Sequence, residues 1–389
     1  MKRIFGGTLV LAALLCASLS AQGPGADDQN KALLAEIEAA WKRQEEAFNE
    51  VEIEWKEELF MPKGSQSNLW QSISESRARL MNPSGEPIPA TDLRLHSSSK
   101  VRLQKSDFSM ERKQAVWSVN AKQFELSVVV HFFDQKGSWL VRPTGLVDWH
   151  EYKKHPSARF GSKLICDGSQ ELPCRPIAMA FRPTHKAFRL FKLEEMSILS
   201  PNEMIDGVDC TKSAIYINGS RSTYIALWLA KSKNFLPIRW AHVHDGTTRL
   251  LYSVKYNQSI SKNFFPSSWS VTNTDDSKRV LESFRCETVL FKDASVGSVK
   301  LDLPAKTFVH DRNNPDGKQY YIITDNGSKR YLSAEELLYP YDQLIEQLQS
   351  EKSGRLNWVY ISIVTITILF FMIVVCVWFV MRRNKSSVP

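Results

Sequence analysis

Residues 220–231 read Ser-Arg-Ser-Thr-Tyr-Ile-Ala-Leu-Trp-Leu-Ala-Lys, and this stretch is predicted to be a β-strand with apolar side chains on both faces. Because side chains alternate along a strand, Tyr224 and Trp228 point one way, and Ile225 and Leu227 point the other. Helices of the same chain can bury one apolar face. The second face requires another covering element, a closing sheet or a ligand.

Short turns separate this strand from its neighbours. Asn218-Gly219 and Asp245-Gly246 are strong hairpin signals, because a type I′ turn requires a positive φ at both central residues. They lie among consecutive strands predicted at about 207–217, 220–231, 237–243, 248–257, 267–273 and 279–291. Earlier strands are predicted at 51–56, 100–105, 108–113, 115–119, 124–132 and 138–142. A sheet of this size is expected to curl under its own twist.

An amphipathic helix is predicted within residues 22–50, before the first strand. Asp27 or Asp28 can cap it, Ile37 and Trp41 recur on one face, and Lys42 lies on the other. The apolar face requires a surface on which to pack. The predicted fold class is therefore mainly β, within the α+β class: a large curved antiparallel sheet covered by helices.

The sheet domain is predicted to cover residues 51–311, with an insertion at about 144–186 that is rich in Pro, Gly and His. Residues 312–357 are predicted to form a hairpin and a helical stalk. The apolar stripe of the stalk, within 340–352, either packs on its own domain or joins two copies as a homo-oligomer. The domain is the closer partner, so we favour packing within the chain.

Both ends of the chain have the patterns of membrane-directed segments. Residues 1–21 combine a basic start, a short apolar run and small residues, as a cleaved signal peptide does. Residues 358–381 carry no charge and are long enough to cross a hydrocarbon core of ~30 Å. Arg382 and Arg383 follow, so the positive-inside rule places the tail 382–389 in the cytoplasm. We expect a single-pass protein of the cell membrane whose bulk is extracytoplasmic, either periplasmic or extracellular.

The chain has six cysteines. Cys16 leaves with the predicted signal peptide, unless it is lipidated or the segment remains as an uncleaved anchor, and Cys376 lies in the predicted span. The other four would face an oxidising compartment, in which disulfides persist. The expected pairs are Cys166 with Cys174 and Cys210 with Cys286, and four buried free thiols are the alternative.

Charge and motifs argue against several function classes. The net charge of +8 is spread along the chain, whereas nucleic-acid binding requires a concentrated basic face. His150 and His155 have the wrong spacing for a zinc-protease helix, and His242 and His244 share a strand face without a third ligand that can be named. The sequence has no G-x-S-x-G, Walker or G-x-G-x-x-G pattern. We therefore expect no metal, no cofactor and no enzyme.

Several segments follow one another in the order of a known family: Asp28–Asn49 leading into Val51–Lys56, then Phe132–Trp139, Trp228–Arg239, Phe264–Pro266 and Leu301–Asp311. Over residues 51–311 the chain resembles the LolA-like half-barrels of the bacterial lipoprotein-carrier superfamily. The resemblance implies a curved antiparallel sheet that wraps over helices and leaves an apolar groove for acyl chains. Carriers of that family are soluble, whereas this chain has a predicted membrane anchor and an insertion.

Two hypotheses follow. The first is a membrane-anchored extracytoplasmic domain that binds a hydrophobic or lipid-like ligand, with candidate contacts at Trp117, Trp139, Tyr224, Trp228 and Trp240. For the tryptophans among them, a place in the sheet core is the alternative. The second hypothesis is a cell-envelope interaction or sensing module with no small-molecule ligand. A void beside the sheet would favour the first.

Overall fold

The computed structural model describes residues 26–65, 85–105, 107–118, 123–134, 137–142, 157–161, 172–185, 190–293, 299, 301, 303–314 and 318–385. The chain divides into two compact units, Met1–Leu303 and Pro304–Pro389. The predicted signal peptide, much of the predicted insertion and the end of the tail lie outside the described residues.

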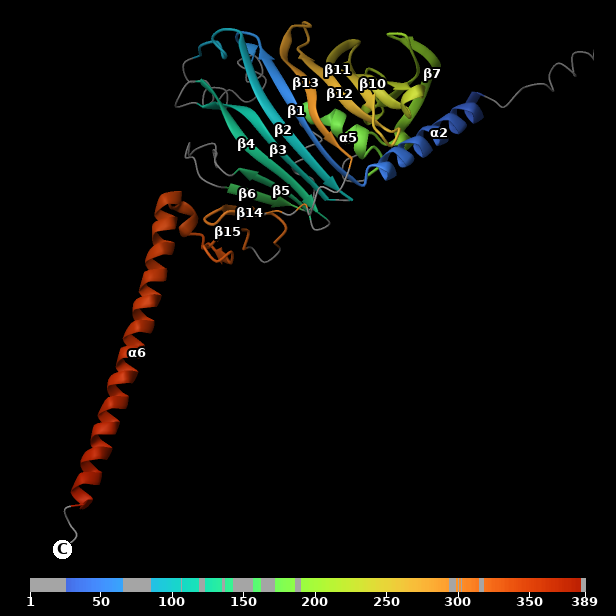
Figure 1. The fold of residues 1–389 in the computed structure, drawn as a ribbon. Helices are drawn as coiled ribbons and strands as arrows, with labels where there is room; N and C mark the ends of the chain where they lie inside the picture. Colours follow the sequence, from blue (N-terminus) through green and yellow to red (C-terminus); the bar gives the residue numbers. More distant parts are fainter. Residues whose placement is uncertain are drawn as a thin grey trace, which may run out of the picture. The chain divides into compact units, whose positions relative to one another are not determined.

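The first unit is built on one large antiparallel sheet (Figure 1). Within this unit the strands neighbour one another in the order β6-β5-β4-β3-β2-β1-β13-β12-β11-β10-β9-β8-β7. The predicted fold class is confirmed. The strand bounds are β1 Glu50–Met61, β2 Leu93–Gln104, β3 Asp107–Ser118, β4 Gln123–Asp134, β5 Gly137–Arg142, β6 Ser157–Gly161, β7 Met196–Ile205, β8 Val208–Tyr216, β9 Thr223–Ala230, β10 Leu236–His244, β11 Thr247–Gln258, β12 Phe264–Thr274 and β13 Val280–Lys292.

Turn chemistry explains most of the meander from β7 to β13. Asp245 and Gly246 have φ values of 45° and 73°, so they form the predicted tight turn between β10 and β11. Asn218-Gly219 instead ends a short 3₁₀ helix, Ile217–Gly219, in a longer connection between β8 and β9. Strand β7 was not predicted. Its turn into β8 is Asp206-Gly207, a two-residue signal of the same kind, with φ values of 49° and 80°.

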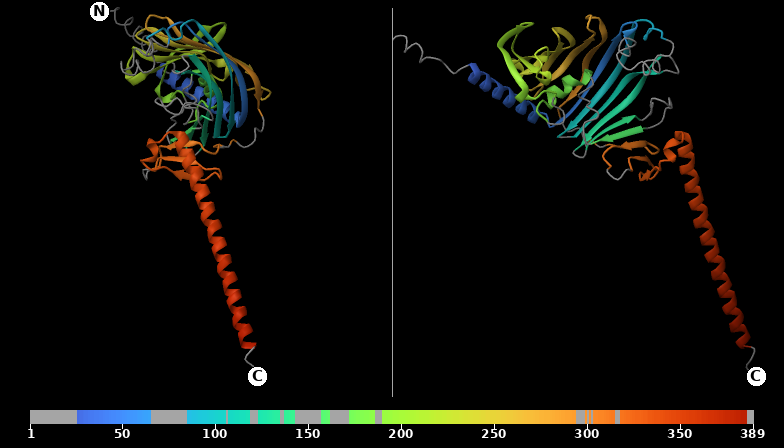
Figure 2. Two further views of the ribbon diagram at one scale, coloured as in Figure 1. Left: turned by 90° about the vertical axis from the view of Figure 1, so that its left-hand side faces the viewer. Right: turned by 180° about the vertical axis from the view of Figure 1, so that it is seen from behind.

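Helices α2 (Ala26–Ala47) and α5 (Arg175–Phe181) cover one face of the sheet, and Figure 2 shows the strands arching over them. Helix α5 lies in the segment predicted as an insertion. Burial of large apolar side chains between helices and sheet is the main favourable contribution to folding here. Fully buried members of this core include Ile37, Trp41, Trp55, Phe181, Trp240 and Tyr252.

Two side chains of α2 add specific polar contacts to this packing. Trp41 Nε1 donates a hydrogen bond of 2.9 Å to the carbonyl of Phe235. The Gln44 side chain is fully buried, and its amide nitrogen donates to the carbonyls of Ala180 and Phe264 at 3.1 and 2.6 Å. These bonds satisfy buried polar groups and fix α2 against both α5 and the sheet.

The expected pair of Cys210 with Cys286 is wrong, because both are buried free thiols. The expected pair of Cys166 with Cys174 falls partly outside the described residues, since Cys166 is not among them. Strands β8 and β13, which carry Cys210 and Cys286, are separated by β9 to β12. Five strand spacings amount to about 24 Å along the sheet, whereas a disulfide requires Cα atoms within about 7 Å. Cys174 packs on Met110, with 3.2 Å between the two sulfur atoms.

The second unit contains strands β14 (Phe308–Asp311), β15 (Tyr320–Ile323) and β16 (Lys329–Tyr331), followed by helix α6 (Tyr341–Lys385). A turn with Gly327 at a φ of 78° joins β15 and β16. The predicted stalk and span form one continuous helix of 45 residues. Its first turn packs within its own unit, since Leu344 is buried and Tyr341 Oη donates to the carbonyl of Lys306 at 2.7 Å.

Within α6, residues Ile361–Trp378 are apolar and exposed, and this is the one candidate membrane span among the described residues. Its 18 residues correspond to about 27 Å of helix, close to the thickness of a hydrocarbon core.

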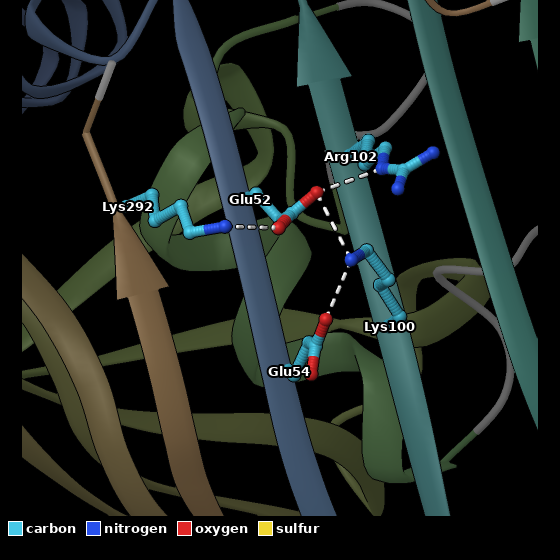
Figure 3. Close-up of polar contacts among 5 residues, drawn as sticks. All are labelled: Glu52, Glu54, Lys100, Arg102 and Lys292. Carbon is cyan, nitrogen blue, oxygen red and sulfur yellow. Dashed lines mark hydrogen bonds and ion pairs between the residues drawn. The ribbon is translucent and has the colours of Figure 1, made fainter. Parts of the chain in front are cut away.

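The face of the sheet opposite the helices carries a network of charged side chains across three strands (Figure 3). Glu52 on β1 contacts Arg102 and Lys100 on β2 at 2.8 and 3.0 Å, and Lys292 on β13 at 3.0 Å. Lys100 also contacts Glu54 at 2.5 Å. Burial alone would raise the pKa of Glu52, but the hydrogen bonds from its cationic neighbours outweigh burial and lower it to about 2.

We expect the network to make stability depend on acid pH. Because the folded pKa of Glu52 lies below its ordinary value of 4.5, the unfolded chain binds more protons between about pH 4.5 and 2. Stability from this carboxylate is complete above that window and is lost as the pH falls through it. Urea unfolding of the full chain in detergent, followed by tryptophan fluorescence, measures this loss.

The Glu52→Gln variant should be less stable by about 1–2 kcal/mol at pH 7 and should lose less stability on acidification. Glu58→Gln is the control, because Glu58 lies on the same strand face and contacts only Arg94 in the ion pairs described. Equal effects of the two variants would show that the cross-strand network has no special role.

Candidate functional site

The predicted ligand-contacting rings do not form one site. Trp240 is fully buried on the face covered by helices, where it stacks on Tyr252 with ring centroids 4.2 Å apart and meets the edge of Phe191. Leu227, its partner in register on β9, is also fully buried. Trp240 thus fills the core, as the alternative for these tryptophans proposed.

Tyr224 and Trp228 lie on the opposite face, in agreement with the alternation of β9. Trp228 is half-buried, and its Nε1 donates to Glu203 Oε1 at 2.9 Å while the Lys212 ammonium lies 5.2 Å from its ring centroid. Tyr224 packs on Tyr216 of β8, with 6.0 Å between ring centroids. These rings stabilise cross-strand contacts among β7, β8 and β9.

The remaining two predicted rings lie in the other half of the sheet. Trp139 is half-buried on β5, opposite Phe132 on β4. Trp117 belongs to β3, and its side chain lies outside the described part of the structure. Neither ring shares a strand with Trp240 or Trp228.

The structure brings together a different set of rings where α2 and α5 end. Phe48 packs edge-on against Phe181 of α5, with centroids 5.1 Å apart. Phe291 of β13 stacks on Phe181 at 6.0 Å and on Phe265 of β12 at 4.0 Å. Phe48 and Phe181 are buried, whereas Phe265 and Phe291 are half-buried. This group, the phenylalanine cluster, therefore extends from the core to the surface.

A polar pocket of about 310 Å³ adjoins the cluster at the same junction. Its lining includes Lys42 and Glu45 of α2, Lys105 after β2, Arg182 and His185. Burial lowers the pKa of His185, more than the neighbouring Glu45 carboxylate raises it. The imidazole is therefore neutral at pH 7, and the permanent positive charges of the pocket are those of Lys42, Lys105 and Arg182.

Arg182 connects the pocket to the cluster. It is 3% exposed and donates hydrogen bonds of 2.8 Å to the carbonyls of Phe48 and Lys105 and of 2.7 Å to that of Phe181. It thus joins the ends of α2 and α5 to the turn between β2 and β3. Because its charge meets carbonyl dipoles in these bonds, the guanidinium remains a site of positive potential.

Sequence reasoning missed this junction. The available signal was Arg182 within the predicted insertion, next to its partner Phe181, but its other partners Lys105 and Phe48 are 77 and 134 positions away along the chain. Of the histidines considered as metal ligands, His242 has its pKa lowered to about 4 by burial and by Arg175, and His244 shares a hydrogen bond of 2.8 Å with Thr223. Within the described residues no group of three or more His, Cys, Asp or Glu side chains could hold a metal ion.

We expect Arg182→Met to destabilise the first unit by about 2–4 kcal/mol, because three buried carbonyls lose charged donors. Thermal unfolding of the full chain in detergent, followed by tryptophan fluorescence, measures the change. Arg285→Met, which removes an exposed guanidinium from β13, should leave the midpoint nearly unchanged. A similar loss in both variants would refute the role assigned to Arg182.

No family model matches this sequence, and no curated protein is similar to it. Among solved structures, the chain is similar to an outer membrane lipoprotein-sorting protein domain from Vibrio parahaemolyticus, with 14% identity, a TM-score of 0.35 and coverage of 66% of this chain and 90% of that chain. It is also similar to a LolA superfamily protein from Nitrosomonas europaea, with 11% identity, a TM-score of 0.34 and coverage of 69% and 94%. A DUF1329 family protein from Desulfovibrio piger has 10% identity, a TM-score of 0.33 and coverage of 68% and 94%. All three TM-scores lie below 0.5, so what is stated of this chain is its own architecture: a large antiparallel sheet with a C-terminal apolar helix.

Proposed function

We propose that this protein is a membrane-anchored extracytoplasmic domain that binds a lipid-like ligand at the junction of α2 and α5. Support for the anchor is the exposed apolar surface of Ile361–Trp378, which is costly in water and favourable in lipid. The basic residues that follow favour a cytoplasmic tail and an extracytoplasmic sheet unit.

The observation that carries the proposed ligand class is the phenylalanine cluster directly beside a pocket that is lined by three cations and two carboxylates. An acyl chain can pack against phenyl rings as these rings pack against one another, and its acidic headgroup can pair with the Lys105 ammonium. Helices rather than a second sheet cover this face. An amphiphile can therefore enter by displacing a helix instead of opening a strand ladder.

The alternative, an interaction module with no small-molecule ligand, is favoured by how completely the described core is filled. Trp41, Trp240 and Tyr252 are fully buried between the helices and the sheet. In that case the phenylalanine cluster is only the edge of a closed core, and lipid would not reach it.

The topology can be tested with reporter cysteines added one at a time to the parent chain. Ser277→Cys places a thiol in the exposed turn between β12 and β13, and Ser386→Cys places one in the tail. In intact cells with a permeable outer layer, a membrane-impermeant maleimide should label the first variant at once and the second only after the membrane is lysed. The parent protein is the control, because Cys174, Cys210 and Cys286 are buried. Labelling of the tail in intact cells would reverse the proposed orientation.

Lipid binding can be tested in membranes with a palmitate analogue that carries a photoreactive diazirine. We expect peptide adducts at Phe265 or Phe291, and a loss of more than half of their yield in Phe265→Ser. Phe308→Ser, a change of the same kind in the second unit, should leave the yield unchanged. Adducts confined to the span 361–378 would support the interaction module instead.

A further inference from the structure

A hollow of about 1080 Å³ lies on the face of the sheet turned away from α2 and α5. Its lining extends from Lys113 on β3 and Leu126 on β4 to Val208 on β8 and the turn residue Asp206. These strands lie far apart in the sheet order, so the sheet bends around the hollow. The site is separate from the junction of α2 and α5 and is independent of the proposed lipid ligand.

Two rows of side chains cross the strands at the floor of the hollow. In the first row, register partners are Ser98, Lys56, Glu287, Ser268 and Lys255, on β2, β1, β13, β12 and β11. In the second row they are His96, Glu58, Arg285, Ser270, Ser253 and Arg239, reaching β10. Every one of these residues lines the hollow. Residues directly opposite in register share a face, so the rows present one surface of cations and hydroxyls that also includes the carboxylates Glu58 and Glu287.

Register shifts explain why the sheet bends here. The β1–β13 ladder shifts between Glu54 and Trp55, and the β11–β12 ladder shifts between Lys255 and Tyr256. A third shift, in the β9–β10 ladder, falls between Pro237 and Arg239. Bulges of this kind bend the strand and increase its twist. All three lie beside the two rows, so the same irregularities form the hollow and direct these side chains into it.

The charges in the hollow are not balanced within the described residues. Six lysine and arginine residues line it, against four acidic residues. Glu57 is buried in its pair with Arg112. Glu58 pairs with Arg94, which does not line the hollow, and Asp206 pairs with the lining residue Arg239 at 3.5 Å. Lys56, Lys255 and Arg285 form no ion pair in the part of the chain that the structure describes.

Further along the same strands, the cations on this face are paired. In the network of Figure 3, Lys100, Arg102 and Lys292 all contact Glu52 within 3.0 Å. Lys56 follows Glu52 and Glu54 on the same face of β1. One sheet face therefore carries two groups of cations, one paired with Glu52 and one without an ion pair among the described residues. The basic composition of the chain does not explain why only one group is paired, because it applies to both.

We propose that the two rows bind an extended, soluble polyanion that carries phosphate groups. Lys56 and Lys255 are separated by three strand spacings, about 14 Å along the sheet, and the second row spans about 24 Å. Cations at such intervals match charges repeated along a chain. Lysine ammonium groups bind phosphate as point charges, and serine hydroxyls at the same level can donate to its oxygens.

The shape of the hollow favours a chain over a membrane surface. The lining extends from Lys113 and Leu126 on β3 and β4 to Val208 on β8, with the two rows between them. A single strand of polymer can lie along rows in a sheet that bends around them, whereas a flat layer of headgroups fits a flat surface. A volume of about 1080 Å³ exceeds that of a single phosphate ion many times over.

The test uses the full chain in nanodiscs of neutral lipid, with inorganic polyphosphate of about ten units as the probe, in titration calorimetry at physiological salt. Lys56→Gln combined with Lys255→Gln should weaken binding by about tenfold or more, equivalent to about 1.4 kcal/mol. Both lysines are exposed, so folding should be retained, and the melting temperature checks this. Ser268→Ala combined with Ser270→Ala should weaken binding by a few fold.

The matched control is Lys262→Gln combined with Lys278→Gln, which removes two exposed lysines from the turns that flank β12. It should leave the affinity for polyphosphate unchanged, and equal loss in both double variants would overturn the site.

Equal affinity for polyglutamate of the same charge would overturn the assignment to phosphate. Binding to vesicles of anionic lipid but not to polyphosphate would overturn the proposal of a soluble polyanion and would indicate a membrane surface as the ligand. Failure of the palmitate experiment would leave this result untouched, because the two sites lie on opposite faces.

Discussion

The register of β1 against its two neighbours is the constraint on which the first unit depends. This strand joins the sheet of β2 to β6 to the meander that ends in β13, and its ladder with β13 connects residues more than 220 positions apart. It directs Val51, Ile53 and Trp55 into the core beneath the helices. A slip of one residue would exchange these side chains with the charged set on the other face. Both surfaces therefore rest on one alignment.

A buried ion pair lies within the apolar face and also depends on the register of β1. Glu57 of β1 and Arg112 of β3 are nearly buried, and the guanidinium donates to both carboxylate oxygens, at 2.6 and 3.3 Å. Desolvation offsets much of the attraction in such a pair, so its net contribution to stability is small. Misalignment is costly, however, because it would leave a charge buried without its partner. The Glu52 network has the same consequence on the opposite face, where three cations from two strands meet one carboxylate.

The cover over the core combines apolar packing with a few polar contacts at fixed places. Apolar contact between α2 and the sheet is non-directional, so by itself it would allow the helix to slide. Gln44 and Trp41 prevent this, because each donates to a backbone carbonyl that has one position. Arg182 has the same role for α5. The helices are thus held by contacts that can be broken one at a time, which distinguishes them from the strands beneath.

The alternation and the turns of the sequence were sufficient to predict the sheet, the division of β9 into two faces and the C-terminal apolar helix. Alternation does not say which face the helices cover, so Trp240 and Trp228 were grouped although they point in opposite directions. The cysteine pairing failed for a related reason: Cys210 and Cys286 both lie in strands of the meander, but the distance between them depends on strand order. The hollow depends on three register shifts. A β-bulge leaves no clear mark on the alternation of apolar and polar residues, so the periodicity of the sequence does not reveal it. The features carried by side-chain type were accessible from the sequence, whereas those carried by cross-strand register required the structure.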